Sequence, residues 1–445
     1  MKVRFWGTRG SIAAPGPHTN RFGGNTSCVE LRASSGELFI IDCGTGARPL
    51  GLELMKSHPK PIHANILLGH THWDHIQGFP FFLPAFVPGN SFDVFAPEGG
   101  RRSLQETLAG QMEYTYFPVD LSQLPTPITY HELVEGEFEI GGVSVLAQYL
   151  NHPAMTLGYR FHMDGVTVAY MSDHEPFSET LWRSDSAPGY LASILHEGDR
   201  RHASFMAGAD LVIHDAQYTP EEYPSKKNWG HSTYEYVVRL AAAAGVRRLA
   251  LTHHEPVHDD DFIADIERRA RELAAKLPNQ VEVFCAYEGC ELEIFADQVV
   301  DSLLKTRPTV SAGLAPHEAR ILVVDDNPDM RSMTMAALKP EGYVLTQASN
   351  GRDAIRLAAE MNPHMMVLDL MMPNPDGMDV LRALRSKPET SSLPILVITA
   401  SNDPLTASAG FEVGATDYLT KPFSVPQLRA RVRACLARAL RHQEH

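Results

Sequence analysis

The segment from His70 to His75 (HTHWDH) contains four side chains that can bind a metal ion: His70, His72, Asp74 and His75. It follows the apolar run 66–68, which is typical of a buried strand. The strand fixes the backbone, while the loop after it lets the donors converge. Imidazole and carboxylate groups without thiolates suit zinc, or manganese or iron, with one coordination position left open. The segment therefore predicts a metal centre of the catalytic type; the alternative is a polar loop that is merely rich in histidine.

Two further histidines follow later strand-like runs. His152 comes shortly after the run 142–147, and tetrahedral zinc needs a protein donor beyond the first two histidines of the segment. His253 follows the run 248–252. His254 is the alternative, because alternate residues of an extended chain face opposite ways. We therefore expect His152 and one of these two neighbours to join the metal centre.

The spacing His70-x-His72-x-Asp74-His75 after a hydrophobic strand resembles the signature of the metallo-β-lactamase superfamily. The resemblance covers about the first 300 residues and implies an αββα sandwich with one or two metals at the edge of its paired sheets. It implies that Asp42 orders the metal loops. It also implies two divalent metals, one held by His70, His72 and His152, the other by Asp74, His75 and His253, with Asp173 bridging both.

The segment Gly230-His231-Ser232-Thr233, which opens a helix expected over 234–244, resembles the ribonuclease Z and phosphodiesterase branch of that superfamily. The resemblance implies that His231 is a general acid oriented by Asp215, with Asp74 also in the catalytic set; the alternative is a structural histidine at a helix start. His174 stands where relatives often carry threonine. Glu255 follows the last histidines where the branch usually has serine, which argues against processing of transfer RNA.

A second pattern begins at residue 320, where strands and helices alternate at short intervals. This alternation predicts a parallel sheet with helices on both faces. The carboxyl ends of its strands carry Asp325 and Asp326, Asp369, Thr399 and Lys421, and these ends meet at one crevice of such a sheet. Because three gathered carboxylates repel one another unless a hard cation lies among them, the pattern predicts a magnesium site.

This second part closely resembles the response-regulator receiver domain over residues 319–445. The resemblance implies phosphorylation by a sensor histidine kinase or a phosphotransfer protein. A receiver-like fold that is never phosphorylated is the alternative. The implied roles are phosphoacceptor for Asp369, magnesium ligands for Asp325, Asp326 and Asp369, and switch or phosphate contacts for Thr399, Tyr418 and Lys421.

The chain has 445 residues, enough for more than one core, and we expect an α/β protein. The expected domains are a metallo-β-lactamase-fold hydrolase domain at 1–300, a linker at 301–318 and a (βα)5 flavodoxin-like receiver at 319–445. A formal net charge of −15 argues against binding of long nucleic acid. Five scattered cysteines and the lack of a long apolar run predict reduced thiols, a cytoplasmic location and no membrane span; we also expect a homodimer.

The function that these patterns favour is a two-component response regulator whose output is a dinuclear metal-dependent hydrolase. A small phosphodiester, either cyclic nucleotide or RNA-like, is the expected substrate. Two alternatives stay open. One keeps the metals but hydrolyses a carboxylic ester, thioester or lactone, and the other is a non-catalytic signalling module that binds a metal.

Overall fold

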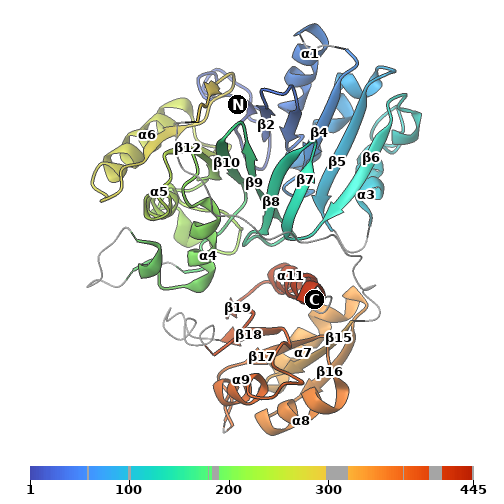
Figure 1. Ribbon diagram of the computed structural model, residues 1–445, viewed down its shortest axis with the longest axis vertical. Coiled ribbons are helices and arrows are strands. Elements are labelled where there is room, and N and C mark those ends of the chain that lie inside the picture. Colours follow the sequence, from blue (N-terminus) through green and yellow to red (C-terminus); the bar gives the residue numbers. More distant parts are fainter. Residues whose placement is uncertain are drawn as a thin grey trace.

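The computed structural model describes residues 1–57, 60–98, 102–178, 180–182, 190–296, 319–373, 375–399 and 413–442, with side chains of the last segment described up to 436 (Figure 1). The N-terminal part contains two sheets that face each other, and the C-terminal part contains a third. This is the α/β architecture that the sequence predicts, an αββα sandwich followed by a receiver fold. The predicted linker at 301–318 lies outside the described residues.

Each sheet of the sandwich has seven strands, of which those bearing the metal-site loops run parallel to one another. The first has the order β14 (Glu291–Glu293), β1 (Lys2–Gly7), β2 (Cys28–Arg32), β3 (Leu38–Ile41), β4 (His63–Leu67), β5 (Ser91–Pro97), β6 (Ile128–Leu133). The second has the order β13 (Glu282–Cys285), β12 (Arg248–Thr252), β11 (Leu211–Asp215), β10 (Val166–Met171), β9 (Leu157–Met163), β8 (Val143–Tyr149), β7 (Gly136–Ile140).

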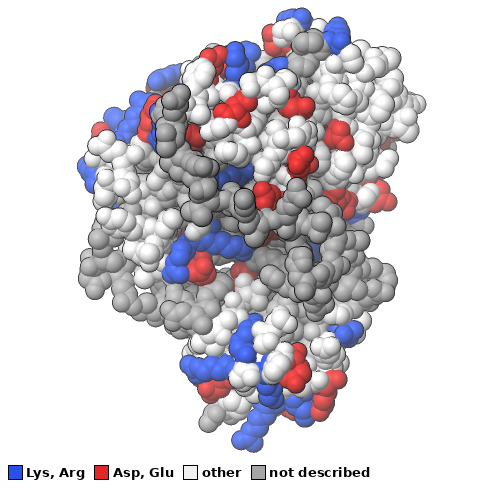
Figure 2. Space-filling model, viewed as in Figure 1, with Lys and Arg blue, Asp and Glu red and all other residues white. Residues whose placement is uncertain are grey.

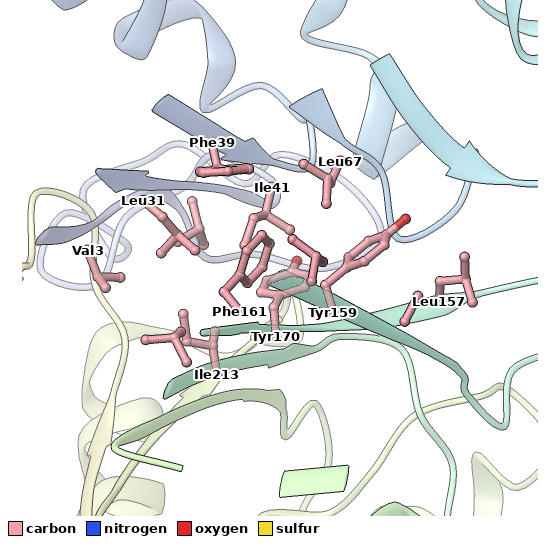
Figure 3. Packing of buried hydrophobic residues seen from close by; sticks show 14 of the residues in the cluster. Val3, Leu31, Phe39, Ile41, Leu67, Leu157, Tyr159, Phe161, Tyr170 and Ile213 are labelled. Atoms are coloured by element: carbon pink, nitrogen blue, oxygen red, sulfur yellow. The ribbon is translucent and has the colours of Figure 1, made fainter. Parts of the chain in front are cut away.

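Alternation along the strands separates the core into layers. In β3, Phe39 and Ile41 face the second sheet, whereas Leu38 and Ile40 face the helices outside. This is the two-residue period of a strand that is buried on both faces. Side chains from the two sheets point toward one another in the central layer, as Figure 3 shows for Phe39 and Phe161, whose ring centroids lie 5.4 Å apart. The central layer fixes the two sheets relative to each other, and hence the loops at their edge.

Helices cover the outer face of each sheet. The first sheet carries α1 (Ala47–Ser57) and α3 (Leu104–Gln111), and the second carries α4 (Glu197–Met206), α5 (Tyr234–Ala243) and α6 (Asp260–Ala274). The helix expected over 234–244 is confirmed, and the Thr233 side chain caps it by accepting from the Tyr236 amide. Short 3₁₀ helices lie in the connections: η1 (Phe79–Phe81), η2 (Leu83–Phe86), η3 (Leu121–Gln123), η4 (Leu191–Ser193), η5 (Tyr223–Ser225) and, in the C-terminal part, η7 (Lys339–Glu341).

The run 280–295, which reads in the sequence as one strand, is two strands in two sheets. β13 joins the second sheet and β14 the first, and a turn at residues 286–290 separates them. Gly289 in this turn has φ +84°, a conformation that favours glycine and ends an extended strand. The run therefore connects the edges of the two sheets. Cys285 and Cys290, on either side of the turn, are both free and buried.

The C-terminal part has a five-stranded parallel sheet with the order β16 (Val344–Ala348), β15 (Arg320–Val324), β17 (Met365–Asp369), β18 (Ile395–Thr399), β19 (Asp417–Thr420). Two apolar clusters cover its two faces. Helices α8 (Gly351–Met361) and α9 (Gly377–Arg385) pack on one face, and α7 (Pro328–Leu338) and α11 (Val425–His442) pack on the other. This arrangement is the doubly wound fold expected from the alternating pattern.

Helix α11 lies on the side of the receiver that faces the sandwich (Figure 1). Its Ala430 and Ala434 belong to the buried cluster between the two seven-stranded sheets. On β19, the Tyr418 ring lies 5.6 Å from the ring of His196 next to α4. The face drawn in Figure 2 mixes acidic and basic side chains without a broad basic area among its coloured residues. Within the described ranges, no helix has the length and apolarity needed to cross a membrane.

Candidate metal centre and receiver site

The predicted ligands meet at one edge of the sandwich. His70 follows β4, the next three donors lie at or beside the short helix α2 (Trp73–Ile76), and His152 follows β8. Asp173 follows β10, and His253 follows β12. These strands present their carboxyl ends to the same edge, so residues far apart in sequence become neighbours. The structure thus brings together all seven residues that the sequence nominates as ligands.

One group consists of His70, His72 and His152, whose donor atoms lie within 4.8 Å of one another. The ring centroid of His70 is 4.3 Å from that of His72 and 4.7 Å from that of His152. His70 is buried, yet neither of its ring nitrogens has a hydrogen-bond partner among the described residues. A buried imidazole without hydrogen bonds is costly, and a metal ion bound at this position would satisfy it.

A second group consists of Asp74, His75 and His253, whose donor atoms also lie within 4.8 Å of one another. The Asp74 Oδ2 atom is 3.3 Å from His75 Nε2 and 3.1 Å from His253 Nε2. All three side chains are buried. One carboxylate and two imidazoles make a donor set that suits zinc, manganese or iron.

Asp173 lies between the two groups. Its Oδ2 atom is 2.8 Å from His75 Nε2 and 3.8 Å from His70 Nδ1, and its Oδ1 atom is 3.3 Å from His253 Nε2. One carboxylate therefore faces donors of both groups. This position fits a ligand shared by two divalent ions, because each carboxylate oxygen has lone pairs for a separate partner. The residues present thus fit the two-metal centre that the resemblance implies.

The electrostatics differ between the two donor groups. Burial alone would lower the pKa of His75 and of His253, but the neighbouring carboxylates of Asp74 and Asp173 raise both, and a bound metal would displace protons from these two rings. Burial lowers the pKa of the His152 imidazole to about 3 and that of His70 well below its usual range, so both rings are neutral at pH 7. Burial alone would raise the pKa of the Asp173 carboxyl, but the neighbouring imidazoles of His253, His75 and His70 outweigh it and hold that pKa well below its usual range. Neutral imidazoles beside an ionised carboxylate are the forms that bind metal.

The outer ring nitrogens of three histidines are held by the surrounding chain. His75 Nδ1 lies 2.7 Å from Asp42 Oδ2, His152 Nδ1 lies 3.0 Å from the Gly230 carbonyl oxygen, and His253 Nδ1 lies 2.9 Å from Gln217 Oε1. Each contact fixes the ring and leaves Nε2 directed into the centre. Asp42 has the ordering role expected for it.

Asp42 also binds the segment before His70 and the strand β10, which leads to Asp173. Its carboxylate accepts hydrogen bonds from the Gly69 amide at 2.7 Å and from the Tyr170 hydroxyl at 2.5 Å. Both partners adjoin segments that carry ligands. Loss of this carboxylate would therefore release several ligands together.

Backbone strain is concentrated at this site. Asp42, Asp173 and His253 have φ values of 59°, 63° and 59°, in the left-handed region that non-glycine residues rarely adopt. Two glycines make room for the histidines. A Cβ atom at Gly10 would lie 2.2 Å from His253 Nδ1, and one at Gly230 would lie 2.2 Å from His152 Nδ1. The Gly-His-Ser-Thr segment thus requires its glycine for packing against a ligand.

His231 and Asp215 lie beside the centre, in an arrangement that differs from the one expected. His231 Nδ1 is 3.1 Å from Asp173 Oδ1 but 3.8 Å from Asp215 Oδ2, so Asp215 makes no hydrogen bond to this ring. The Asp215 carboxylate instead accepts from the backbone amides of Ser232 at 2.7 Å and His174 at 3.0 Å. Because these two amides belong to different loops, Asp215 joins the loop of His174 to the loop of Ser232.

The choice between the two adjacent histidines after β12 is resolved by their directions. His254 Nε2 donates to the Ala286 carbonyl oxygen at 2.9 Å, on the side away from the centre. His253 points into the centre, as the alternation of side chains requires. The left-handed backbone of His253 directs the His253 side chain, and not that of His254, toward the metal centre.

The receiver crevice contains the predicted acidic residues. Donor atoms of Asp325, Asp326 and Asp369 lie within 4.8 Å of one another, at the ends of β15 and β17. Lys421 Nζ lies 3.0 Å from Asp325 Oδ2 and 2.8 Å from Asp369 Oδ2, and Asp326 is exposed. Three carboxylates with one lysine suit a hard divalent cation such as magnesium.

Two predicted switch residues lie on neighbouring strands of the receiver sheet. Thr399 is fully buried at the end of β18, and Tyr418 is buried on β19, where it meets the sandwich. They connect the crevice to the face occupied by α11.

Helix α11 contacts both loops that flank the metal centre. Arg431 NH2 donates to Asn151 Oδ1 at 2.5 Å, next to His152, and its NH1 group pairs with Asp417 Oδ2 at 3.2 Å. Gln427 Nε2 donates to Asn228 Oδ1 at 3.2 Å, near His231. The last helix of the receiver is therefore attached to the segments that precede two candidate site histidines.

Several residues at the site are missed by sequence reasoning. Gln217 lies two residues beyond the end of β11, and Glu175 lies two residues beyond Asp173; Glu175 accepts from the Gly230 amide at 2.9 Å. A polar residue just after a buried strand is a signal that could identify both. Arg431 has no such signal, because its partner Asn151 lies 280 positions earlier in the chain.

Comparison with protein families identifies both parts of the chain. Residues 38–254 match the model of the beta-lactamase superfamily domain, and residues 321–433 match the model of the response regulator receiver domain. The first part of the chain thus contains a domain that matches the beta-lactamase superfamily domain, and the second part contains a domain that matches the response regulator receiver domain.

Individual relatives match one part each. Response regulator MprA of Mycolicibacterium vanbaalenii is 46% identical over 119 residues, which cover 27% of this chain and 51% of that protein. The DNA-binding dual master transcriptional regulator RpaA of Synechocystis is 41% identical over 119 residues, covering 27% and 49%. The chain spans about half the length of the curated relatives it matches. The crystal structure of the short form of human tRNase Z aligns with 22% identity over 66% of this chain and 99% of that one, with a TM-score of 0.45.

Proposed function

We propose that this protein is a two-component response regulator whose output domain is a dinuclear metal-dependent hydrolase of phosphodiesters. The observation that carries the proposal is the arrangement of two donor groups that share Asp173. Two donor groups joined by one carboxylate would hold two divalent ions close together, and such a pair would supply charge stabilisation suited to a phosphoryl group. A phosphodiester uses both sites, which is why it is the proposed substrate.

The metals, when bound, would supply Lewis acidity that lowers the pKa of water toward neutrality and offsets negative charge on the phosphoryl oxygens. The residues that would hold them are His70, His72 and His152 on one side, Asp74, His75 and His253 on the other, and Asp173 on both. Zinc fits this set of imidazoles and carboxylates, as manganese or iron would.

The protein's own side chains supply orientation and a proton. His231, beside Asp173 and 92% buried, is placed to donate a proton from its ring to the leaving oxygen. Asp42 and Gln217 keep two of the ligand rings in fixed tautomers, and Asp215 keeps the His231 loop against the His174 loop. Because these contacts exist before substrate arrives, the site is preorganised.

The receiver crevice supports phosphotransfer to Asp369. Its carboxylate would attack the phosphorus of a phosphohistidine in a sensor kinase or phosphotransfer protein, and the histidine leaves as the P–N bond breaks. Magnesium at Asp325 and Asp326 would offset the charge of the incoming group. Lys421 already lies 2.8 Å from Asp369 Oδ2, and it would bind the added phosphoryl oxygens.

Regulation would pass through the connection from β19 to α11. Lys421 directly follows β19, and α11 begins at Val425, with its contacts to the metal-site loops further along the helix. When Lys421 shifts toward a phosphoryl group, the start of α11 shifts with it. The loops before His152 and His231 then change position.

The test of the catalytic proposal compares two model substrates. Zinc- or manganese-loaded protein is assayed with bis(p-nitrophenyl) phosphate and with p-nitrophenyl acetate, in the wild type and in His72→Ala. We expect metal-dependent turnover of the phosphodiester that His72→Ala lowers about a hundredfold or more, with weaker turnover of the ester. Preference for the ester, or phosphodiester turnover unchanged in the variant, would contradict the proposal.

The test of regulation uses the same assay with acetyl phosphate and magnesium. Phosphorylation should change the rate for wild type and leave Asp369→Asn unaffected, because the variant lacks the acceptor carboxylate. An equal response in both would show that acetyl phosphate acts elsewhere.

A further inference from the structure

A cleft of about 450 Å³ lies at the boundary between the sandwich and the receiver. One of its walls contains Thr71 and His72, and His72 is the exposed member of the first donor group. Pro153 and Met155, which follow the ligand His152, line the same wall. The cleft therefore opens directly at the candidate metal centre.

The receiver supplies the opposite wall. Pro426, Arg429, Ala430 and Arg433 of α11 line the cleft, in the position between the two domains where Figure 1 shows this helix. A molecule that fills the cleft would contact both domains. Residues of the receiver can therefore take part in substrate recognition.

The charges that line the cleft are all of one sign. Arg102, from the segment before α3, joins Arg429 and Arg433, and no carboxylate is among the described lining residues. Two other cavities of the described residues each have three carboxylates in their walls, and Arg102 borders one of them as well. The whole chain has a formal net charge of −15, whereas the charged residues that line this cleft are arginines. This local excess of positive charge favours an anionic ligand.

One buried carboxylate stands behind two of these arginines. Glu341 Oε1 lies 3.4 Å from Arg429 Nε, and Glu341 Oε2 pairs with Arg433. Arg102 has Glu106 nearby, as Arg429 and Arg433 have Glu341, yet none of these carboxylates is among the described residues that line the cleft. Because the planar guanidinium binds phosphate through paired hydrogen bonds, arginines held in place by Glu341 suit a phosphate group.

The receiver wall is fixed relative to the metal centre. Arg431 binds Asn151 and Gln427 binds Asn228, so α11 is attached on both sides of the site histidines. The Arg431 guanidinium also lies 4.4 Å from the centroid of the Phe177 ring. These contacts set the distance from the arginines to the metal centre before a ligand binds.

We propose that this cleft binds a second anionic group of the substrate, a phosphate beyond the phosphodiester that is cleaved, and that Arg102, Arg429 and Arg433 recognise it. The inference rests on the proposed hydrolase function and narrows the substrate class. The substrate would be an oligonucleotide-like molecule with at least two phosphate groups. A cyclic nucleotide with one phosphate would leave the cleft without an anion.

The test uses dinucleotides that differ by one terminal phosphate. The KM of the metal-loaded full chain is measured for TpT, for pTpT and for TpTp. We expect one of the phosphorylated dinucleotides to have a KM about tenfold lower than that of TpT, with similar kcat. The preference should decrease as salt is raised, because exposed charges are screened. Equal KM values for all three dinucleotides would overturn the inference.

Arg102→Gln is the variant that tests the arginines. It should remove most of the tenfold preference and leave the KM for bis(p-nitrophenyl) phosphate, which has no second phosphate, within about twofold. Arg268→Gln is the matched control, because Arg268 is exposed on α6 and does not line the cleft. A preference that persists in Arg102→Gln, or that disappears equally in Arg268→Gln, would count against the proposal.

Binding without turnover separates this inference from the proposed function. Calorimetry with methylene-bridged analogues of TpT and pTpT, in which the cleavable oxygen is replaced, measures the same phosphate contribution without hydrolysis. If bis(p-nitrophenyl) phosphate is not hydrolysed but the analogues still differ about tenfold in affinity, the function fails and the cleft stands. If hydrolysis occurs and the analogues bind equally, only the cleft assignment fails.

Discussion

The two acidic sites of this molecule handle negative charge in opposite ways. At the edge of the sandwich, Asp74 and Asp173 are buried among imidazoles, and Asp173 has a strained backbone. In the receiver crevice, Lys421 contacts two carboxylates, and Asp326 is exposed to solvent. The first site is built at a cost in burial and strain, whereas the second is partly open to solvent and its lysine offsets part of the negative charge.

This difference indicates what each site depends on. A cluster of buried histidines and carboxylates gains stability when a cation binds, so the sandwich should depend strongly on metal. A crevice with an internal lysine and an exposed carboxylate can gain or lose a cation or phosphoryl group at little cost. We expect tight binding at the first site and reversible exchange at the second.

Removal of metal should have the largest effect and should separate the two sites. A ligand at a hundred times its Kd stabilises a folded protein by about 2.7 kcal/mol, so two metals contribute about 5 kcal/mol. Chelation should therefore lower the Tm of the sandwich by several degrees, measured by calorimetry of the full chain. Addition of millimolar magnesium after chelation should not restore the Tm of the sandwich. A single transition that magnesium fully restores would show that the two sites do not differ.

Substitution of the shared carboxylate should have the next largest effect. Asp173→Asn removes the negative charge that faces both donor groups, and we expect kcat for bis(p-nitrophenyl) phosphate to fall about a thousandfold, equivalent to about 4 kcal/mol. Asp326→Asn, the matched change in the receiver, should alter basal kcat less than threefold. Metal content measured in both variants distinguishes loss of metal from loss of activity. Equal losses in the two variants would contradict the comparison.

A third carboxylate shows what happens when burial outweighs the compensating contacts, here hydrogen bonds from the Tyr236 hydroxyl and the Phe177 amide. Asp199 on α4 is fully buried, and burial raises the pKa of its carboxyl from 3.8 to about 7. Between these two values the unfolded chain is ionised while the folded chain keeps its proton, so stability falls as pH rises through this window. The variant that keeps the shape without the charge is Asp199→Asn.

We expect Asp199→Asn to be more stable than wild type at pH 8 by about 3 kcal/mol more than at pH 5. Urea unfolding at the two pH values measures this change. Asp265→Asn, on the exposed surface of α6, is the control and should show no such pH dependence. A constant difference between Asp199→Asn and wild type at both pH values would show that Asp199 is ionised throughout.

The smallest expected effect is at the contact between the two domains. Arg431→Gln removes the charged contact to Asn151 and Asp417, and we expect kcat to fall about tenfold with little change in KM for bis(p-nitrophenyl) phosphate, because the loop before His152 loses an anchor. Arg431→Lys should restore part of the rate. Unchanged kcat in Arg431→Gln would mean that α11 does not position the loop.

Much of this arrangement is readable from the sequence, because both folds place chemistry at strand ends. The buried strands and the polar residues that follow them predict the meeting of His70, His152, Asp173 and His253. The same logic predicts the meeting of the acidic residues in the receiver. The sequence therefore predicts those features that depend on a single strand and the loop that follows it.

The parts that are not readable depend on distances between elements. The sequence gives no reason for Asp215 to bind backbone amides rather than His231, since both arrangements use the same strand end. The run 280–295 divides between two sheets at a turn that only the packing of β13 and β14 explains. The contact of Arg431 with Asn151 joins surfaces of separate folds, and no local pattern encodes it.

The position of α11 has a consequence for the exchange of parts between proteins. Receivers are usually regarded as interchangeable units, but this one lines a cleft beside the candidate metal centre with Arg429 and Arg433 and contacts Asn151 through Arg431. A foreign receiver grafted onto the sandwich could accept a phosphoryl group and still leave the output domain incomplete. Under the proposed function, only a graft that brings arginines to the same three helical positions would restore the cleft and its attachment to the loop before His152, so the two domains would change together in the course of evolution.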